Sequence, residues 1–80
     1  VQKTKTVTLD MVELTSGVES ETITVKVTAS IDGGATNSVY EKTIATSATT
    51  SPSFTINGYQ NAAIKIYVNG NLKKEETINF

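Results

Sequence analysis

The stretch ETITVKVTA, residues 21–29, places an apolar side chain at every second position. Ile23, Val25, Val27 and Ala29 fall on one face of an extended chain, and threonines with Lys26 fall on the other. Successive side chains of a β-strand point to opposite faces, so this pattern predicts a strand with one face in a core and the other in water.

The rest of the chain is composed of similar residues. Threonine, valine and isoleucine make up 29 of the 80 residues, against three leucines and six alanines. Branched side chains lose freedom in a helix and pack well on a pleated sheet, so we expect strands throughout and no helix. The length predicts a single domain over residues 1–80, which at this size buries about 60% of its unfolded surface.

The N-terminal segment from Lys3 to Leu9 predicts an edge strand, because its inner face becomes apolar only at its end. Lysines on an outer strand also oppose sheet-to-sheet aggregation, which is the simplest role for Lys3 and Lys5. We expect residues 11–14 to continue this strand after a kink near Asp10. Ser16 and Gly17 then predict a turn.

Two further strands are expected in the middle of the chain. Asp32-Gly33-Gly34 tolerates positive φ and predicts a loop, followed by a strand from about Ser38 to Thr46 with Tyr40 and Ile44 inward. Residues 47–53, SATTSPS, predict a connection. A short strand with Phe54 and Ile56 on one face then ends at Gly58.

The last third predicts a hairpin, residues 62–68 and 72–80, around Asn69-Gly70-Asn71. A two-residue loop would set Lys65 opposite Lys74, an unfavourable pair of like charges. A three-residue loop with a glycine bulge sets Lys65 opposite Glu75 instead and pairs Val68 with Leu72. We therefore predict the three-residue loop, which places Tyr67 and Lys73 in one outward polar and aromatic strip.

Together these segments predict an all-β fold, a two-sheet antiparallel sandwich of about seven short strands. The expected core consists of inward-facing apolar positions of the predicted strands: Val7, Leu9, Ile23, Val25, Val27, Tyr40, Ile44, Phe54, Ile56, Ile64, Ile66, Val68, Ile78 and Phe80.

Composition restricts the function. The net charge is −1, and arginine, histidine, cysteine and tryptophan are absent. A nucleic-acid binder of this size usually has an excess of basic residues, including arginines that bind phosphates and base edges, so we expect no nucleic-acid partner. The common proton shuttle, the thiol nucleophile and the nitrogen and sulfur metal ligands are missing as well, so we expect no enzyme activity, no catalytic residue and no cofactor.

Three segments carry a resemblance to a known family: FTINGY at 54–59, AIKIYVNGN at 63–71 and the closing TINF at 77–80. They resemble fibronectin type III or immunoglobulin-like bacterial modules, including the accessory β-sandwiches of Gram-positive surface proteins and class A penicillin-binding proteins. Tyr59 lies near the position of the family's corner tyrosine. The resemblance implies a non-catalytic spacer or interaction module, excised from a larger cell-surface or cell-wall protein.

The alternative function is binding of carbohydrate or another cell-wall ligand, because aromatic faces stack on sugar rings. The candidate contact residues are Tyr59, Tyr67 and Lys73. The competing interpretation is structural: Tyr67 covers a cross-strand pair and Tyr59 fills a corner of the sandwich.

Two other hypotheses receive less weight. Asp10 with Glu13, and Glu19 with Glu21, carry oxygen ligands, but their spacing matches no calcium loop, so we expect no metal site. An amide crosslink from Lys3 or Lys5 to Asn79 would need a buried pocket, and alternation places Asn79 outward.

We expect an extracellular or cell-envelope location in a Gram-positive bacterium, since the chain has no cysteine and is rich in threonine, serine and asparagine. No apolar run is long enough to cross a membrane, so no direct membrane insertion is expected. The expected partners are the other domains of the parent polypeptide and cell-wall glycan, and the expected state is a monomer.

Overall fold

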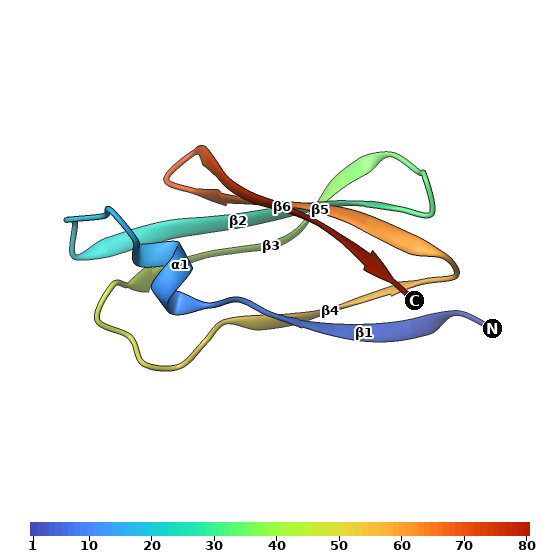
Figure 1. The fold of residues 1–80 in the computed structure, drawn as a ribbon, viewed down its shortest axis with the longest axis horizontal. Coiled ribbons are helices and arrows are strands. Elements are labelled where there is room, and N and C mark those ends of the chain that lie inside the picture. Colours follow the sequence, from blue (N-terminus) through green and yellow to red (C-terminus); the bar gives the residue numbers. More distant parts are fainter.

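The computed structural model describes residues 1–80 and contains six strands and one short helix (Figure 1). The strands form two antiparallel sheets, one of two strands in the order β1-β4 and one of four in the order β3-β2-β5-β6. The all-β, two-sheet antiparallel architecture is therefore confirmed, with six strands where about seven were expected. The elements are β1 (Lys3–Thr8), α1 (Met11–Thr15), β2 (Thr22–Ile31), β3 (Thr36–Ala45), β4 (Ser53–Gly58), β5 (Asn61–Val68) and β6 (Asn71–Asn79).

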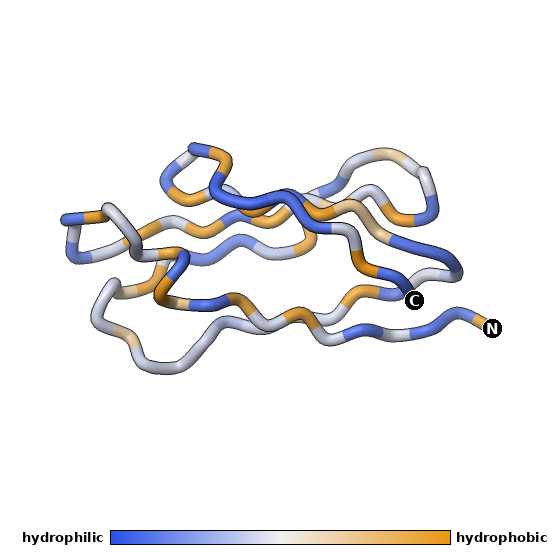
Figure 2. Tube along the Cα trace, viewed as in Figure 1, coloured by the Kyte–Doolittle hydropathy of each residue, from blue (hydrophilic) through white to orange (hydrophobic).

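The core lies between the two sheets. Hydrophobic positions alternate with polar ones along the strands, as Figure 2 shows. The central strand β2 follows the predicted alternation, with Val25 and Val27 fully buried. The predicted core residues are all buried or packed against the core, and Leu14, Ala29 and Ala62 are buried with them.

Aromatic residues connect the sheets at β3. Tyr40 and Ile44 face inward, as predicted, and both are half-buried. The ring of Tyr40 stacks on Phe54 of β4, with ring centroids 5.3 Å apart. This contact places β4 over the β3 side of the larger sheet, so β1 lies on the side towards β5 and β6.

Residues 11–15 form one turn of helix, not a continuation of the first strand, so the prediction of an all-strand chain is wrong here. The side chain of Asp10 accepts a hydrogen bond from the Val12 amide at 2.9 Å and caps the helix. Leu14 is only 2% exposed. A single turn is unstable alone, so burial of Leu14 stabilises it where composition disfavours a helix.

The predicted three-residue turn of the hairpin is wrong. Asn69 and Gly70 both have positive φ, 51° and 83°, and form a two-residue turn in which Val68 pairs with Asn71. Leu72 pairs with Tyr67, not with Val68, and is 51% exposed. Two-residue hairpin turns with positive φ at both positions match the twist of the strands, and Asn-Gly suits them.

The register beyond the turn agrees with the prediction. Lys65 lies opposite Glu75, with the nitrogen and oxygen 3.7 Å apart, and Ala62 lies opposite Ile78. The register shifts between Ile66 and Tyr67, which leaves Lys73 as an extra residue in β6. Because of this bulge, the hairpin has both a two-residue turn and the favourable pairing of Lys65 with Glu75. The bulge also changes the direction of the Lys73 side chain.

The one helix, α1, has five residues and is too short to span a membrane.

Candidate functional site

Tyr67 lies on the outer face of the four-stranded sheet and is half-buried there. Lys26 of β2 is its register partner on one side and Leu72 of β6 on the other. A shallow groove of about 440 Å³ surrounds the ring, and its lining residues are Thr24, Lys26, Thr28, Glu41, Tyr67 and Gly70. The groove offers an aromatic face, hydroxyl groups and both signs of charge.

Lys73 is not part of that surface, so the predicted strip of Tyr67 and Lys73 is wrong. The Lys73 ammonium donates a hydrogen bond to the Ser16 carbonyl at 2.8 Å, beside α1 on the inner side of the sheet. The bulge at Lys73 is the physical reason, because it breaks the alternation from which an outward direction was inferred.

Tyr59 projects from the connection between β4 and β5, and its side chain is 63% exposed. It does not fill a corner of the sandwich. Phe80 does so instead, since its ring packs against Gly58. Tyr59 and Tyr67 lie at opposite ends of β5, so the structure does not bring the three candidate contact residues together.

The backbone at Tyr59 is fixed by Asp32, a role that sequence analysis missed. The Asp32 carboxylate accepts hydrogen bonds from the amides of Tyr59 at 2.8 Å, Gln60 at 2.6 Å and Asn61 at 3.1 Å. These bonds, those from Tyr59 and Gln60 foremost, hold the pKa of Asp32 below its usual value. The Asp-Gly pair at 32–33 predicted a turn but not which distant amides it would bind.

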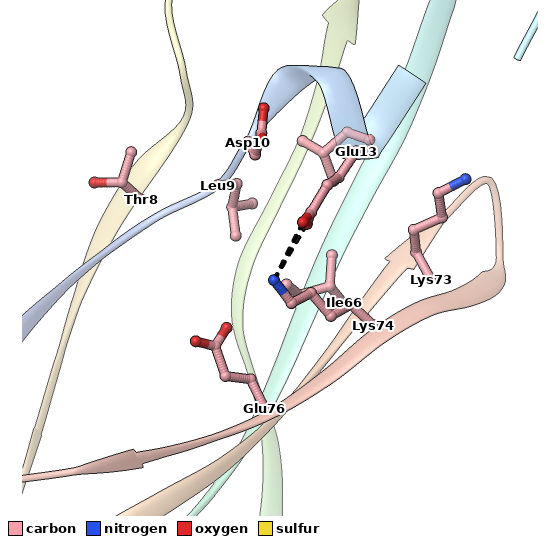
Figure 3. A pocket seen from close by; sticks show the side chains of 9 residues that line it. Thr8, Leu9, Asp10, Glu13, Ile66, Lys73, Lys74 and Glu76 are labelled. Carbon is pink, nitrogen blue, oxygen red and sulfur yellow. Dashed lines mark hydrogen bonds and ion pairs between the residues drawn. The ribbon is translucent and has the colours of Figure 1, made fainter. Parts of the chain in front are cut away.

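A second pocket, of about 280 Å³, lies on the inner side between α1 and β6 (Figure 3). Leu9, Leu14 and Ile66 supply its apolar lining, and charged side chains surround them. Lys74 and Glu76 of β6 are on one wall, and Asp10 and Glu13 are on the other.

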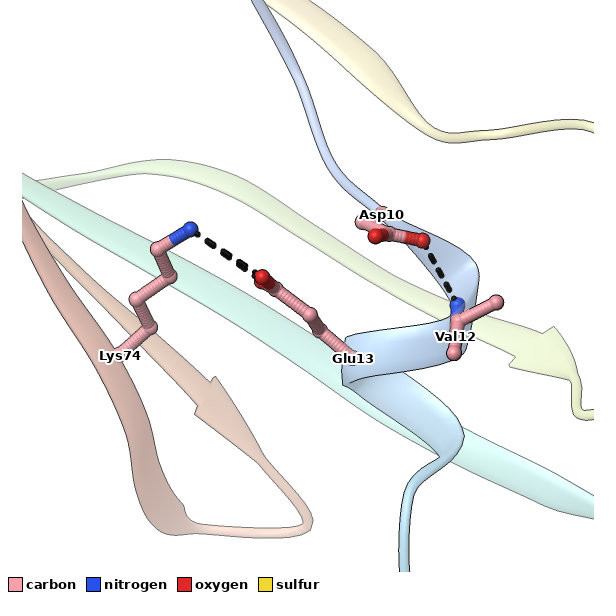
Figure 4. Close-up of polar contacts among 4 residues, drawn as sticks. All are labelled: Asp10, Val12, Glu13 and Lys74. Atoms are coloured by element: carbon pink, nitrogen blue, oxygen red, sulfur yellow. Dashed lines mark hydrogen bonds and ion pairs between the residues drawn. The ribbon is translucent and has the colours of Figure 1, made fainter.

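The charged side chains of this pocket contain one ion pair. The Lys74 ammonium and the Glu13 carboxylate are 3.2 Å apart (Figure 4). The hydrogen bond and charge of Glu13, followed by the charges of Glu76 and Asp10, raise the pKa of Lys74 above its usual value. Asp10 is directed to the amide of Val12. Both carboxylates thus stabilise α1.

The remaining candidates do not assemble into sites. No group of three or more histidine, cysteine, aspartate or glutamate side chains is placed to hold a metal ion. Lys3, Lys5 and Asn79 are all exposed, so the buried pocket that an amide crosslink needs is not formed around them.

Comparisons with protein-family models, with curated proteins and with solved structures give no match to this chain. The fold and its surfaces define an all-β domain of two antiparallel sheets.

Proposed function

We propose that this chain is a non-catalytic accessory domain of the fibronectin III or immunoglobulin-like kind, and that it serves a larger bacterial cell-surface or cell-wall protein as a spacer or interaction module. The strand order supports the proposal. β2, β5 and β6 are adjacent in one sheet, as are strands C, F and G of such sandwiches, and β1 pairs with β4 as B pairs with E. An extracellular or cell-envelope location and a monomeric state belong to the same proposal.

The observation that carries the interaction role is the placement of the chain ends. The domain measures 42 × 21 × 16 Å, and both ends lie at the same end of its long axis (Figure 1). Polypeptide joined to Val1 and to Phe80 would therefore leave the domain side by side. The domain then projects from its parent and exposes its long faces to partners, which favours interaction over in-line spacing.

Replacement of residues 1–80 in the parent polypeptide by a flexible glycine-serine linker tests this role. We expect unchanged turnover by any catalytic domain of the parent and weaker attachment of the parent to cell walls. Loss of turnover with unchanged attachment would contradict an accessory interaction role.

A second candidate function is glycan binding at the groove around Tyr67, favoured by the half-buried ring beside the Thr24 and Thr28 hydroxyls. Peptidoglycan fragments and polysaccharides, titrated into 15N-labelled protein, should shift amide signals around Tyr67. Tyr67→Ala should abolish the shift, whereas Tyr59→Ala at the other end of β5 should leave it. The absence of shifts across the panel would exclude this function.

A further inference from the structure

The groove around Tyr67 contains a lysine that forms no ion pair. Lys26 lies on the outer face of β2, between its register partners Glu41 of β3 and Tyr67 of β5. Both ion pairs of the structure lie elsewhere, so Lys26 and Glu41 are unpaired although they lie opposite each other. β2 and β5 are the two inner strands of the larger sheet, so Lys26 and Tyr67 lie away from its edges.

Lys26 differs in this respect from the other lysines that line pockets. Lys65 and Lys74 are held in ion pairs, and the Lys73 ammonium donates to the Ser16 carbonyl at 2.8 Å. Lys26 lines the groove of about 440 Å³ and is exposed. Its ammonium group is therefore free to bind a ligand in that groove.

The surroundings of Lys26 suit a sugar ring. Tyr67 is half-buried, and Leu72 on the other side of it is 51% exposed, so the two side chains form a small apolar surface. Thr24 and Thr28, two positions before and after Lys26, place hydroxyl groups on the same face. A sugar that stacks on Tyr67 can exchange hydrogen bonds with these hydroxyls, which both donate and accept.

Strand spacing determines which charge is nearer to such a ligand. Neighbouring strands are about 4.8 Å apart, so Lys26 is one strand away from Tyr67 and Glu41 is two strands away. A substituent of a sugar on Tyr67 is therefore closer to the ammonium group than to the carboxylate. An ammonium group has three donors and binds a carboxylate as a compact charge.

We propose that the groove around Tyr67 binds an acidic sugar, a pyranose that carries a carboxylate, with the sugar ring on Tyr67 and its carboxylate on Lys26. This inference rests on the proposed glycan-binding function and specifies the ligand of the same groove. Glu41 competes with the ligand for Lys26. Exposed ion pairs contribute little free energy, so a ligand carboxylate replaces Glu41 at small cost.

Oligogalacturonate and its methyl ester are the probes, because they share rings and hydroxyls and differ in charge. In titrations of 15N-labelled protein, the acid should shift the amide signals of Lys26 and Tyr67. It should also bind about tenfold more tightly than the ester, as expected for a hydrogen bond to a charged group. Added salt should reduce this difference, since Lys26 is exposed.

A second pair of probes distinguishes the source of the carboxylate. N-acetylmuramic acid differs from N-acetylglucosamine by a lactyl group that carries a carboxylate. A preference for the muramic acid identifies a cell-wall sugar as the ligand, whereas a preference for galacturonate alone identifies a uronic acid. Either preference supports binding of an acidic sugar.

Three variants test the role of Lys26. Lys26→Gln should remove the preference, so that acid and ester bind equally. Lys65→Gln is the matched control and should keep the preference, because Lys65 lies on the same outer face but is paired with Glu75. Glu41→Gln should strengthen binding of the acid, because it removes the competing carboxylate. Circular dichroism verifies that each variant is folded.

Equal Kd values for acidic and neutral sugars, or a preference that survives Lys26→Gln, would overturn the proposal and leave glycan binding itself intact. Shifts confined to Lys73 and Lys74 would place the carboxylate on another surface and would also overturn it. Weaker binding of the acid by Glu41→Gln would contradict competition for Lys26 and count against the proposal. The absence of shifts with every probe would exclude glycan binding at this groove, and the proposal with it.

Discussion

Gly58, the last residue of β4, lies where the two sheets close at the C-terminal end of the chain. It is buried although it has no side chain. A Cβ placed there would lie 2.8 Å from Cγ2 of Ile31 and 2.9 Å from Cδ2 of Phe80. Carbon atoms prefer separations of about 3.5–4.0 Å, so Gly58→Ala forces Phe80 and Ile31 to move by most of an ångström.

We expect Gly58→Ala to lower the free energy of unfolding by about 1–3 kcal/mol, the usual cost of overpacking. The φ of Gly58 is not in the left-handed region, so the cost is steric and not a backbone strain. For a domain of this size the midpoint of thermal unfolding should fall by about 4–8 °C for each kcal/mol. Urea and thermal denaturation measure both quantities.

A double-mutant cycle identifies the clash. Phe80→Ala removes the ring but not Ile31, so Gly58→Ala should cost less in that background than in the wild type, and the two changes should couple by about 0.5–3 kcal/mol. Gly17→Ala is the matched control, because its Cβ would meet no atom within 4 Å. It costs stability only through its positive φ of 75° and should not couple to Phe80. Additive effects of Gly58→Ala and Phe80→Ala would refute the packing of Phe80 on Gly58.

Three further predictions concern the core, the Asp32 cluster and the helix cap. Ile64→Ala, at a site 1% exposed, should cost about 2–5 kcal/mol in urea denaturation, and a loss below about 1 kcal/mol would contradict its place in the core. The pKa of Asp32 is lower in the folded state than in the unfolded state. Its carboxylate therefore stabilises the fold at pH values above the unfolded-state pKa, and this stabilisation is lost as the pH falls through the folded-state pKa. In urea denaturation at a series of pH values, the stability difference between the wild type and Asp32→Asn should therefore shrink below about pH 4. A difference that does not change with pH would show that the charge of Asp32 does not stabilise the fold. Asp10→Ala should cost about 0.5–2 kcal/mol and Asp10→Asn much less, whereas equal costs would exclude capping of α1.

The strands were predictable where one face is buried along the whole segment. The alternation at 21–29 reports the buried face of β2 directly, since a shift of one residue would invert every side chain. The six-strand count and the sheet order were not predictable, because they depend on pairing between segments far apart in the chain.

The helix and the hairpin were only partly predictable. Asp10, with Glu13 three residues on, is a helix-start signal, and the prediction of a continued strand does not use it. A single register throughout the hairpin predicts an outward Lys73, whereas the bulge at Lys73 gives the hairpin two registers. The predicted face of Lys73 is therefore wrong, and Lys73 does not join Tyr67 in one surface.

Amide hydrogen exchange along β1 in the isolated chain tests the central claim, that β1 pairs with β4 on one edge and is open on the other. The account predicts slow exchange at Lys5, Val7 and Leu9, whose amides face β4, and fast exchange at Thr4, Thr6 and Thr8. Uniform protection along β1, or protection of the threonines instead, would contradict it.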